Sequence, residues 1–484
     1  MKKFLCLMAL LVAGVSLAGC DMTGIGGPGQ TANGKTTITF WHAMGQANQT
    51  VIQQMIDSFE IAYPMFEVVQ TSQGGYTDLR DKILYSVPVG EGPTIAQAYP
   101  DHIANYLYAN ALTSLDEYIN DTATIASKIN YTLDPTWATG AAATTQVGWT
   151  AADIADFVDA FYAEGSVYGD GKMYCVPFNK STEVLFYNKD FFQLYATQLA
   201  QYGVQADGSW RNPTWDQVEG IAKFYKTTAE YNALEATLKE VASGFSVDSE
   251  ANLFITLTQQ WGGKYTGFDA SGKGQYLFNN AQSKEAISWF AKNFSDGIFG
   301  TAQKFGTDYS SDAFKAMQCI MTTGSSAGAS YNTTENFKTG VAEYPQRADG
   351  QNKNVIQQGT NVCLFERDND LEELGGWLFM KWMTNFDNAL LWCTSTAYFP
   401  IRESVYNSAE YQDKVNNPDP EKITTASQAQ LVGWSQQAYF YTSEAFMGSS
   451  KARDEAEGLV RAILTGTPID QAYQAAIDNC NSRI

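Results

Sequence analysis

A polar segment interrupts a run of aromatic and β-branched residues between residues 172 and 192, near the middle of the chain. Pro177 cannot donate a ladder hydrogen bond, and the Asn-Lys-Ser-Thr segment that follows suits a central strand poorly. We therefore expect a strand that crosses between two lobes, with its pairing broken between residues 176 and 183. The break would free backbone groups and the hydroxyls of Ser181 and Thr182 for a ligand, although an ordinary turn would explain the same residues.

The histidines and cysteines form no metal-binding pattern. Only His42 and His102 are present, and the cysteines lack the short doublets of a zinc site, so the sequence predicts neither a metal nor a cofactor. Once Cys6 and Cys20 are set aside with the N-terminal segment, five cysteines remain, an odd number that cannot all pair. We expect mostly buried apolar thiols and leave any pairing among them open: Cys175, Cys319, Cys363, Cys393 and Cys480.

An enzyme is the main alternative to a binding protein. Paired carboxylates are available in a chain with 52 acidic residues, so composition alone does not exclude a glycosidase. There is no His-Glu-x-x-His pair, and acid–base chemistry by histidine would have only His42 and His102 to draw on. We expect neither a nucleophile elbow nor a phosphate loop, and therefore no enzyme.

The net charge limits the partners that the protein can have. The 484 residues include 52 acidic and 31 basic side chains, which gives a formal charge of −21. Such a body repels nucleic acid and anionic membrane surfaces. An anionic ligand would need a local cluster of donors, because the overall field opposes it, and a small enclosed ligand meets that need better than a polyanion. The length predicts two domains.

The first twenty residues are typical of a bacterial signal peptide, with two lysines, an apolar core from Phe4 to Val15 and Leu-Ala-Gly-Cys at 17–20. This ending resembles the lipobox of bacterial lipoproteins, which implies that Cys20 is acylated; a plain secretory signal is the alternative. Residues 21–35 predict a flexible tether. Since no later segment has the ~18 apolar residues of a membrane span, we expect an extracytoplasmic body held at the membrane by its lipid.

Strand and helix patterns alternate in the body, which predicts a parallel sheet covered by helices. The first strands are expected at 36–41, 66–70 and 94–98, and helical spacing of apolar residues occurs at 52–63 and 79–87. Residues 120–150 include a run of small side chains and are treated as an insertion of unknown shape. Further helices are expected at 153–164, 214–227, 281–294, 375–385 and 456–464.

Short motifs spread over almost the whole body resemble those of bacterial extracellular solute-binding proteins of the carbohydrate-importing kind, above all the glycerol-3-phosphate-binding subclass. The Met-Thr-Thr-Gly-Ser-Ser part is more specific to that subclass than the rest. The motifs are Phe40-Trp41-His42, Gly74-Gly75-Tyr76, Pro177–Thr182 with Tyr187–Asp190, Pro213-Thr214-Trp215, Cys319–Ser326 and Ala397-Tyr398-Phe399-Pro400.

The resemblance implies an α/β, two-lobed periplasmic-binding-protein fold, with a ligand cleft between the lobes and a hinge of crossing strands. By this pattern the first lobe takes residues 36–180 and 360–431, and the second takes 181–359 and 432–484. It also implies a function in transport rather than catalysis. The protein would capture a small molecule and deliver it to the transmembrane permease subunits of an ABC importer.

The ligand residues of the subclass carry over to six positions of this chain, and they suit a phosphate group. Arg453 would supply a forked charged donor, the serines and a tyrosine would supply hydroxyls, and Gly359 would let a backbone N–H approach closely. Singly, each has an ordinary alternative as a core-edge aromatic, a turn residue or a surface ion pair. The implied set is Tyr76, Ser181, Ser325, Gly359, Tyr398 and Arg453, with Trp41, Asp101 and Thr182 as possible further contacts.

Two departures from the subclass pattern affect the glycerol end of the site. Pro100 stands where the subclass has an acidic residue, with Asp101 one place on, and residues 249–252 hold no counterpart of the tryptophan that walls the pocket. The expected ligand is therefore glycerol-3-phosphate or a larger glycerophosphodiester. A neutral sugar or oligosaccharide is the alternative within the same importer family, and a surface adhesin is a third class.

Overall fold

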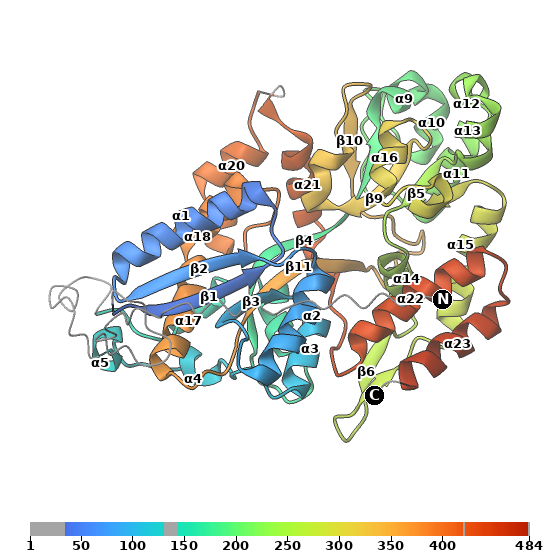
Figure 1. Cartoon of the computed structure of the whole chain (residues 1–484). Coiled ribbons are helices and arrows are strands. Elements are labelled where there is room, and N and C mark those ends of the chain that lie inside the picture. The colour runs from blue at the N-terminus through green and yellow to red at the C-terminus, as the bar shows by residue number, and fades with distance from the viewer. Residues whose placement is uncertain (1–33, 130–143, 420–421, 483–484) are drawn as a thin grey trace, which may run out of the picture.

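The computed structural model describes residues 34–129, 144–419 and 422–482 (Figure 1). The signal sequence, Cys20 and nearly all of the tether lie outside these ranges. Within them, no helix is both long enough and apolar enough to cross a membrane.

The first part of the body has the predicted alternation of strands and helices. The first strand pairs in parallel with the second and the third, as predicted, but the third pairs antiparallel with its other neighbour, so the sheet as a whole is mixed. The first helix buries one apolar face at the expected spacing. The elements are β1 (Thr36–His42), α1 (Gln46–Ala62), β2 (Phe66–Ser72), α2 (Tyr76–Ser86), β3 (Ile95–Ala98) and α3 (Pro100–Tyr108).

Two long strands, β4 (Cys175–Asn188) and β11 (Val355–Leu364), cross the middle of the molecule (Figure 1). They lie next to each other in a sheet of order β2-β1-β3-β11-β4-β9-β5-β8. The predicted break in pairing is wrong, because β11 pairs with β4 from Cys175 to Thr182. The register shifts once, leaving Phe178 as an extra residue, and such a bulge tolerates the neighbouring Pro177.

The far half of β4 belongs to a second group of strands. There β4 pairs antiparallel with β9 and β10, and β9 continues in parallel to β5 and then β8. One short strand runs parallel to β11, and a separate hairpin completes the strands. Their bounds are β5 (Phe245–Val247), β6 (Thr266–Phe268), β7 (Gly274–Tyr276), β8 (Phe299–Thr301), β9 (Met321–Ser325), β10 (Thr339–Ala342) and β12 (Phe440–Tyr441).

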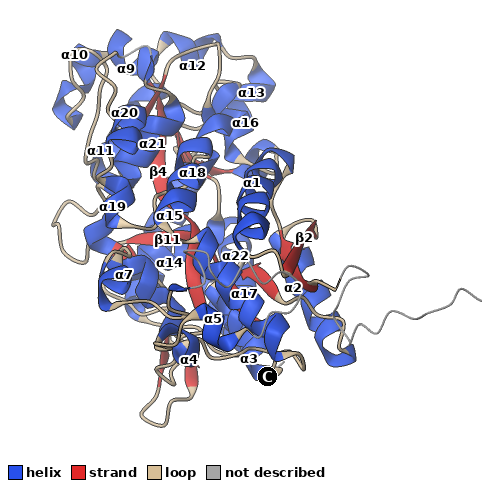
Figure 2. Ribbon diagram, turned by 90° about the vertical axis from the view of Figure 1, so that its left-hand side faces the viewer, coloured by secondary structure: helices blue, strands red, loops and turns tan. Residues whose placement is uncertain are grey.

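Helices cover the outside of the molecule while the strands run through its middle (Figure 2). Thr214 caps its predicted helix by accepting from the Gln217 N–H. The longer helices are α11 (Trp215–Tyr225), α14 (Glu250–Gln260), α15 (Ala281–Ser295), α17 (Asp370–Met383), α18 (Phe386–Ser395), α21 (Thr425–Trp434), α22 (Ser449–Leu464) and α23 (Ile469–Asn481). Shorter ones are α9 (Lys189–Leu194), α10 (Ala196–Leu199), α12 (Ala229–Ala233), α13 (Ala236–Val241), α16 (Ser310–Lys315), α19 (Glu403–Tyr406) and α20 (Ala409–Val415).

The segment between α3 and β4 differs from its prediction. The helix expected at 153–164 is two short helices, α7 (Ala151–Ala155) and α8 (Asp159–Ala163). The expected insertion contains α5 (Ile125–Lys128), while 130–143 lie outside the described residues. Its end is part of the core, because Val147 and Trp149 are buried there.

Two large hydrophobic cores lie on either side of the crossing strands. One gathers side chains of β1, α1, α17 and α18, and the other those of α11, α14, α15, α22 and α23. Both include residues of β4, at opposite ends of that strand. All five cysteines of the described body are buried, as the sequence predicts, and none of them forms a disulfide within the described residues.

Candidate ligand-binding site

A cavity of about 590 Å³ lies against the crossing strands and is lined from both sides of them. Its size is in the ordinary range for small-ligand pockets. It brings together residues of β4, β9, β11, the start of α2 and the loop before α19. Five of the six residues of the implied binding set line it: Tyr76, Ser181, Ser325, Gly359 and Tyr398.

Two serine hydroxyls lie side by side in this cleft. Ser325, the last residue of β9, donates from its Oγ to the Oγ of Ser181 on β4 at 3.3 Å. The Ser325 Oγ also accepts from the Ala327 N–H, so the chain turns just after the strand. Strand pairing therefore places both hydroxyls before any ligand arrives, because Ser181 pairs with β11 and Ser325 with β4.

The partly buried tyrosines Tyr76 and Tyr398 line the same space. The side-chain Nδ2 of Asn179 on β4 donates to the Oη of Tyr76 at 3.2 Å. The side-chain Oδ1 of Asn179 accepts hydrogen bonds from Gln97 and Thr360. Burial, then the nearby Tyr398, raises the pKa of Tyr76 well above its usual value, and burial raises that of Tyr398. Both phenols therefore stay protonated near neutral pH and can donate hydrogen bonds to an anion.

Gly359 is required by the way in which the two strands cross. Its φ is +88°, and a Cβ placed there would lie 1.9 Å from the backbone oxygen of Asn179. Directly across, Lys180 donates to the Gly359 oxygen at 3.3 Å and forms a fully buried ion pair with Glu164. Glu164 also accepts a hydrogen bond from the side chain of Asn361 at 2.7 Å, which links the ion pair to β11.

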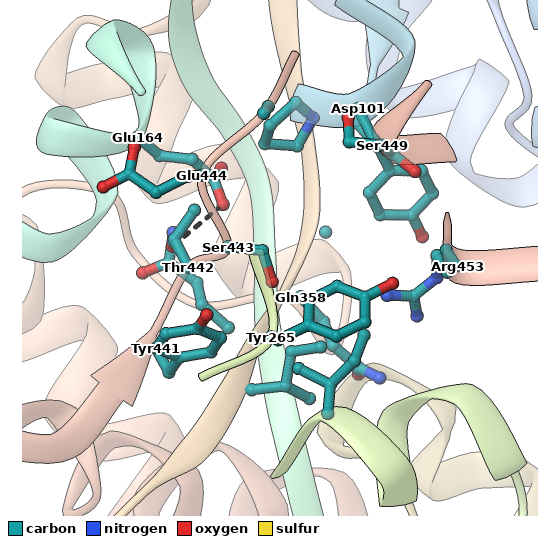
Figure 3. Close-up of a pocket in the computed structure, with 17 residues that line it drawn as sticks. Asp101, Glu164, Tyr265, Gln358, Tyr441, Thr442, Ser443, Glu444, Ser449 and Arg453 are labelled. Carbon is teal, nitrogen blue, oxygen red and sulfur yellow. Dashed lines mark hydrogen bonds between the residues drawn. The ribbon is translucent and has the colours of Figure 1, made fainter. Parts of the chain in front are cut away.

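A second, smaller hollow of about 90 Å³ adjoins the cleft and contains the sixth predicted residue, Arg453, together with Asp101 (Figure 3). The two spaces share Tyr99, Gln358 and Gly359. We call this second space the hinge hollow. Because the two spaces adjoin at these shared residues, a ligand in the cleft lies close to the space that contains Arg453.

The hinge hollow is lined by polar groups without hydrogen-bond partners. The hydroxyl of Tyr265, a residue only 2% exposed, points toward Arg453 (Figure 3). Among the described residues neither this hydroxyl, the side-chain amide of Gln357 nor the Oε1 of Gln358 has a partner. Buried polar groups are normally satisfied, so this space suits water or a polar ligand.

Two of the possible contacts do not reach either space. Thr182 is fully buried; its hydroxyl donates to the Ile356 oxygen at 2.8 Å and its N–H to Ser326. Since neighbouring strand residues point to opposite faces, Thr182 faces away from the side that Ser181 presents. Trp41 packs against the small core beside β3.

The sequence analysis did not identify several residues that line the cleft from the second group of strands. Asp248 and the tyrosines Tyr309 and Tyr331 are among them, and the two tyrosines are 62% and 69% exposed. Lys315 also lines the cleft but is paired with Asp312 at 3.2 Å. The clue in the sequence is weak: each tyrosine lies in a loop or short turn close to a serine-rich segment.

Two sequence motifs that are typical of enzymes do occur, contrary to expectation, but their structural context differs from that in the enzymes. Residues 324–328 match Gly-x-Ser-x-Gly, yet the central Ser326 is fully buried and accepts from the Thr182 N–H. Residues 267–273 match Gly-x-x-x-x-Gly-Lys, yet they form the β6–β7 hairpin rather than a strand-to-helix loop. In the described ranges, no three His, Cys, Asp or Glu side chains are placed to hold a metal.

Comparison with known proteins agrees with this geometry. A family model described as bacterial extracellular solute-binding protein matches residues 54–419. The sn-glycerol-3-phosphate-binding periplasmic protein UgpB of Shigella dysenteriae is 22% identical over 389 residues, 79% of this chain and 78% of the relative. The UgpB of Salmonella typhimurium is 23% identical over 400 residues, 80% of each chain.

Solved structures share the two-lobed fold. UgpB of Mycobacterium tuberculosis in complex with glycerophosphocholine has a TM-score of 0.66 at 17% identity, covering 93% of this chain and 98% of that one. An ABC substrate-binding protein of Listeria monocytogenes in complex with cycloalternan has a TM-score of 0.67 at 18% identity, covering 92% and 98%. These likenesses concern the fold, and the family match over most of the body shows that the chain belongs to the bacterial extracellular solute-binding proteins.

Proposed function

We propose that the protein is the substrate-binding lipoprotein of an ABC importer, and that it captures glycerol-3-phosphate or a glycerophosphodiester for the permease subunits. The observation that carries this proposal is the set of hydroxyl donors in one cleft, with Arg453 in the adjoining hollow. The relatives named for glycerol-3-phosphate support the ligand class.

The donors suit a small anion in a protein whose overall charge opposes one. The formal net charge of −21 produces an electrostatic field that repels anions, so an anion must be bound by short-range contacts. The cleft offers two serine hydroxyls and two protonated phenols, and the protein's own hydrogen bonds hold those of Ser181, Ser325 and Tyr76. Arg453 adds a guanidinium, which can hold two phosphate oxygens at once.

The hinge hollow favours a diester over a monoester. Its volume of about 90 Å³ exceeds several times the roughly 10–15 Å³ that one water needs. The unpartnered groups of Tyr265 and Gln357 offer donors and acceptors to the second alcohol of a diester. The relative from Mycobacterium tuberculosis was solved with such a compound, glycerophosphocholine.

A neutral sugar is the second candidate, and two observations favour it. The exposed rings of Tyr309 and Tyr331 border the cleft, where an apolar sugar face can pack against them. Solved relatives with cycloalternan or maltotriose share the fold.

Calorimetric titration of the wild-type protein with glycerol-3-phosphate, glycerophosphocholine and a set of disaccharides tests the choice. We expect both phosphorylated compounds to bind, the diester at least as tightly as the monoester. Binding of neutral sugars alone would replace the phosphate proposal with the sugar alternative.

We also propose the arrangement of the chain around this function. The first lobe comprises residues 36–180 and 360–431 and the second 181–359 and 432–484; the two large cores on either side of β4 support this division. Residues 1–20 form the signal peptide and 21–35 the tether.

The anchor is proposed to be a lipid on Cys20. Replacing Cys20 with Ser should move the protein from the detergent phase to the aqueous phase in a detergent partition, because the lipid would be its only anchor. Continued recovery with detergent would contradict the proposed anchor and leave the ligand proposal unaffected.

A further inference from the structure

A buried carboxylate stands behind Arg453 and is linked to it by one side chain. Glu183 on β4 is 2% exposed, and its Oε1 accepts from the Nδ2 of Asn252 at 3.0 Å. Asn252, in the first turn of α14 and 3% exposed, accepts with its Oδ1 from the Nη2 of Arg453 on α22. One chain of hydrogen bonds therefore joins β4, α14 and α22.

The chemistry of the three groups fixes the direction of this chain. A carboxylate only accepts and a guanidinium only donates, whereas an amide has one end of each kind. An ionised Glu183 therefore requires the NH₂ of Asn252 to face it, which turns the amide oxygen toward Arg453. With the amide reversed, two acceptors would meet at Glu183 and two donors would meet at Arg453.

The charges around Glu183 come from three other elements. Asp248, between β5 and α14, carries the same charge as Glu183, and Arg453 on α22 carries the opposite charge. The buried phenol of Tyr344 is the third titratable group that interacts with Glu183. The Oε2 of Glu183 has no hydrogen-bond partner among the described residues. Burial raises the pKa of Glu183 to about 7, while the Asn252 hydrogen bond and Arg453 lower it.

Fold stability does not account for a carboxylate in this place. A buried charge is unfavourable unless it is fully paired, and within the described ranges the Glu183 carboxylate has one hydrogen bond and no direct cation. An apolar residue on this face of β4 would fill the space at lower cost. The arrangement does, however, hold a guanidinium in a fixed direction beside the ligand space.

We propose that Glu183 and Asn252 are positioning residues that direct Arg453 toward the anionic group of the ligand, and that Glu183 makes this binding sensitive to pH near neutrality. The inference rests on the proposed role of Arg453 in ligand binding. When Glu183 is protonated it can donate to the Asn252 oxygen, so the amide reverses and Arg453 loses its acceptor.

The sign of the pH dependence separates this role from a simple charge effect. If Glu183 positions Arg453, affinity for an anion falls as the pH drops through about 7. If Glu183 acts only as a nearby negative charge, its protonation removes repulsion, and affinity rises over the same range. A phosphodiester is the proper probe, because its single charge does not titrate near neutral pH.

The experiment is calorimetric titration with glycerophosphocholine between about pH 5.5 and 8.5, around the carboxyl midpoint. The wild type should bind several-fold more weakly at the acid end. Glu183→Gln should flatten the profile, and Asn252→Ala should flatten it and lower affinity about tenfold at pH 8, the loss expected for a hydrogen bond to a charged group. Glu366→Gln, at the far end of β11, should keep the wild-type profile.

Affinity that stays constant or rises toward low pH in the wild type would overturn the proposal, as would a wild-type profile in Glu183→Gln. If no phosphorylated compound binds at all, the proposed function is contradicted. The positioning of Arg453 by Glu183 can then still be tested in the protein without ligand. Side-chain NMR signals of Arg453 should then titrate in the wild type and stay fixed in Glu183→Gln. A fixed Arg453 signal in both proteins would contradict it.

Discussion

The cleft and the hinge hollow lie next to each other, but their polar groups are in different states. In the cleft the hydroxyls of Ser181, Ser325 and Tyr76 already have protein partners. In the hollow the Tyr265 hydroxyl and the Gln357 amide have none among the described residues. The polar groups of the cleft are therefore preorganised by the protein, whereas those of the hinge hollow are available to a ligand or water.

This difference follows from the elements that build each space. The cleft lies on β4 and β11, whose crossing is fixed by strand pairing, by Gly359 and by the Lys180–Glu164 ion pair. The hollow also borders β11, but its other walls come from α3, α14, α22 and the segments around β6 and β12. Substitutions at the crossing should therefore cost stability, whereas substitutions in the hollow should cost affinity.

The largest expected effect is at the buried ion pair. Lys180→Met leaves Glu164 as an uncompensated buried charge and should lower the free energy of unfolding by about 3–5 kcal/mol. The double variant Lys180→Met/Glu164→Gln should recover part of the loss, since no buried charge remains. Urea denaturation measures both. Equal stability of the wild type and Lys180→Met would show that the pair does not hold the crossing.

Gly359→Ala should come next. The added Cβ meets the Asn179 oxygen at 1.9 Å and requires an unfavourable φ, so we expect a loss of about 2–5 kcal/mol. Gly350→Ala is the matched control, because Gly350 also has a positive φ but nothing lies within 4 Å of its Cβ position. The control should lose about 1–2 kcal/mol by the same denaturation assay. Similar losses for both would mean that the strand contact contributes nothing.

The smallest expected effect on stability is in the hollow. Tyr265→Phe removes a buried hydroxyl that has no hydrogen-bond partner among the described residues, so stability should be unchanged or slightly higher. Affinity for glycerophosphocholine should fall by about 0.5–1.5 kcal/mol, the net worth of one hydrogen bond. Thermal denaturation and calorimetry give the two values. A clear loss of stability with no loss of affinity would contradict the assignment of the hinge hollow to ligand binding rather than to fold stability.

Much of the first lobe could be predicted from the sequence because its elements carry strong local patterns. The apolar residues of α1 recur at helical spacing, and β1, β2 and β3 alternate with helices. The interruption in β4 was a wrong prediction for a physical reason. The partner that pairs its polar segment is β11, about 180 residues later, which no local pattern indicates.

The site was predictable only in part. Ser181 and Tyr398 lie in motifs that resemblance could match. Asn252 meets Arg453 only because α14 packs against α22, and Tyr265, just before β6, lines the same hollow as Arg453 only in the folded protein. Thr182 is a possible contact by sequence, yet strand alternation turns it to the face opposite Ser181.

The most direct test of the ligand class is the effect of Arg453→Ala on calorimetric affinity, because this guanidinium is the charged donor that a phosphate requires. Glycerol-3-phosphate and glycerophosphocholine should each lose about 2–5 kcal/mol of binding free energy, while any disaccharide that binds should lose far less. Arg347→Ala, which removes an arginine paired with Asp349 away from the cleft, should leave every affinity unchanged. If only neutral sugars bind, and Arg453→Ala leaves their affinity intact, the account of a phosphate-binding cleft is contradicted.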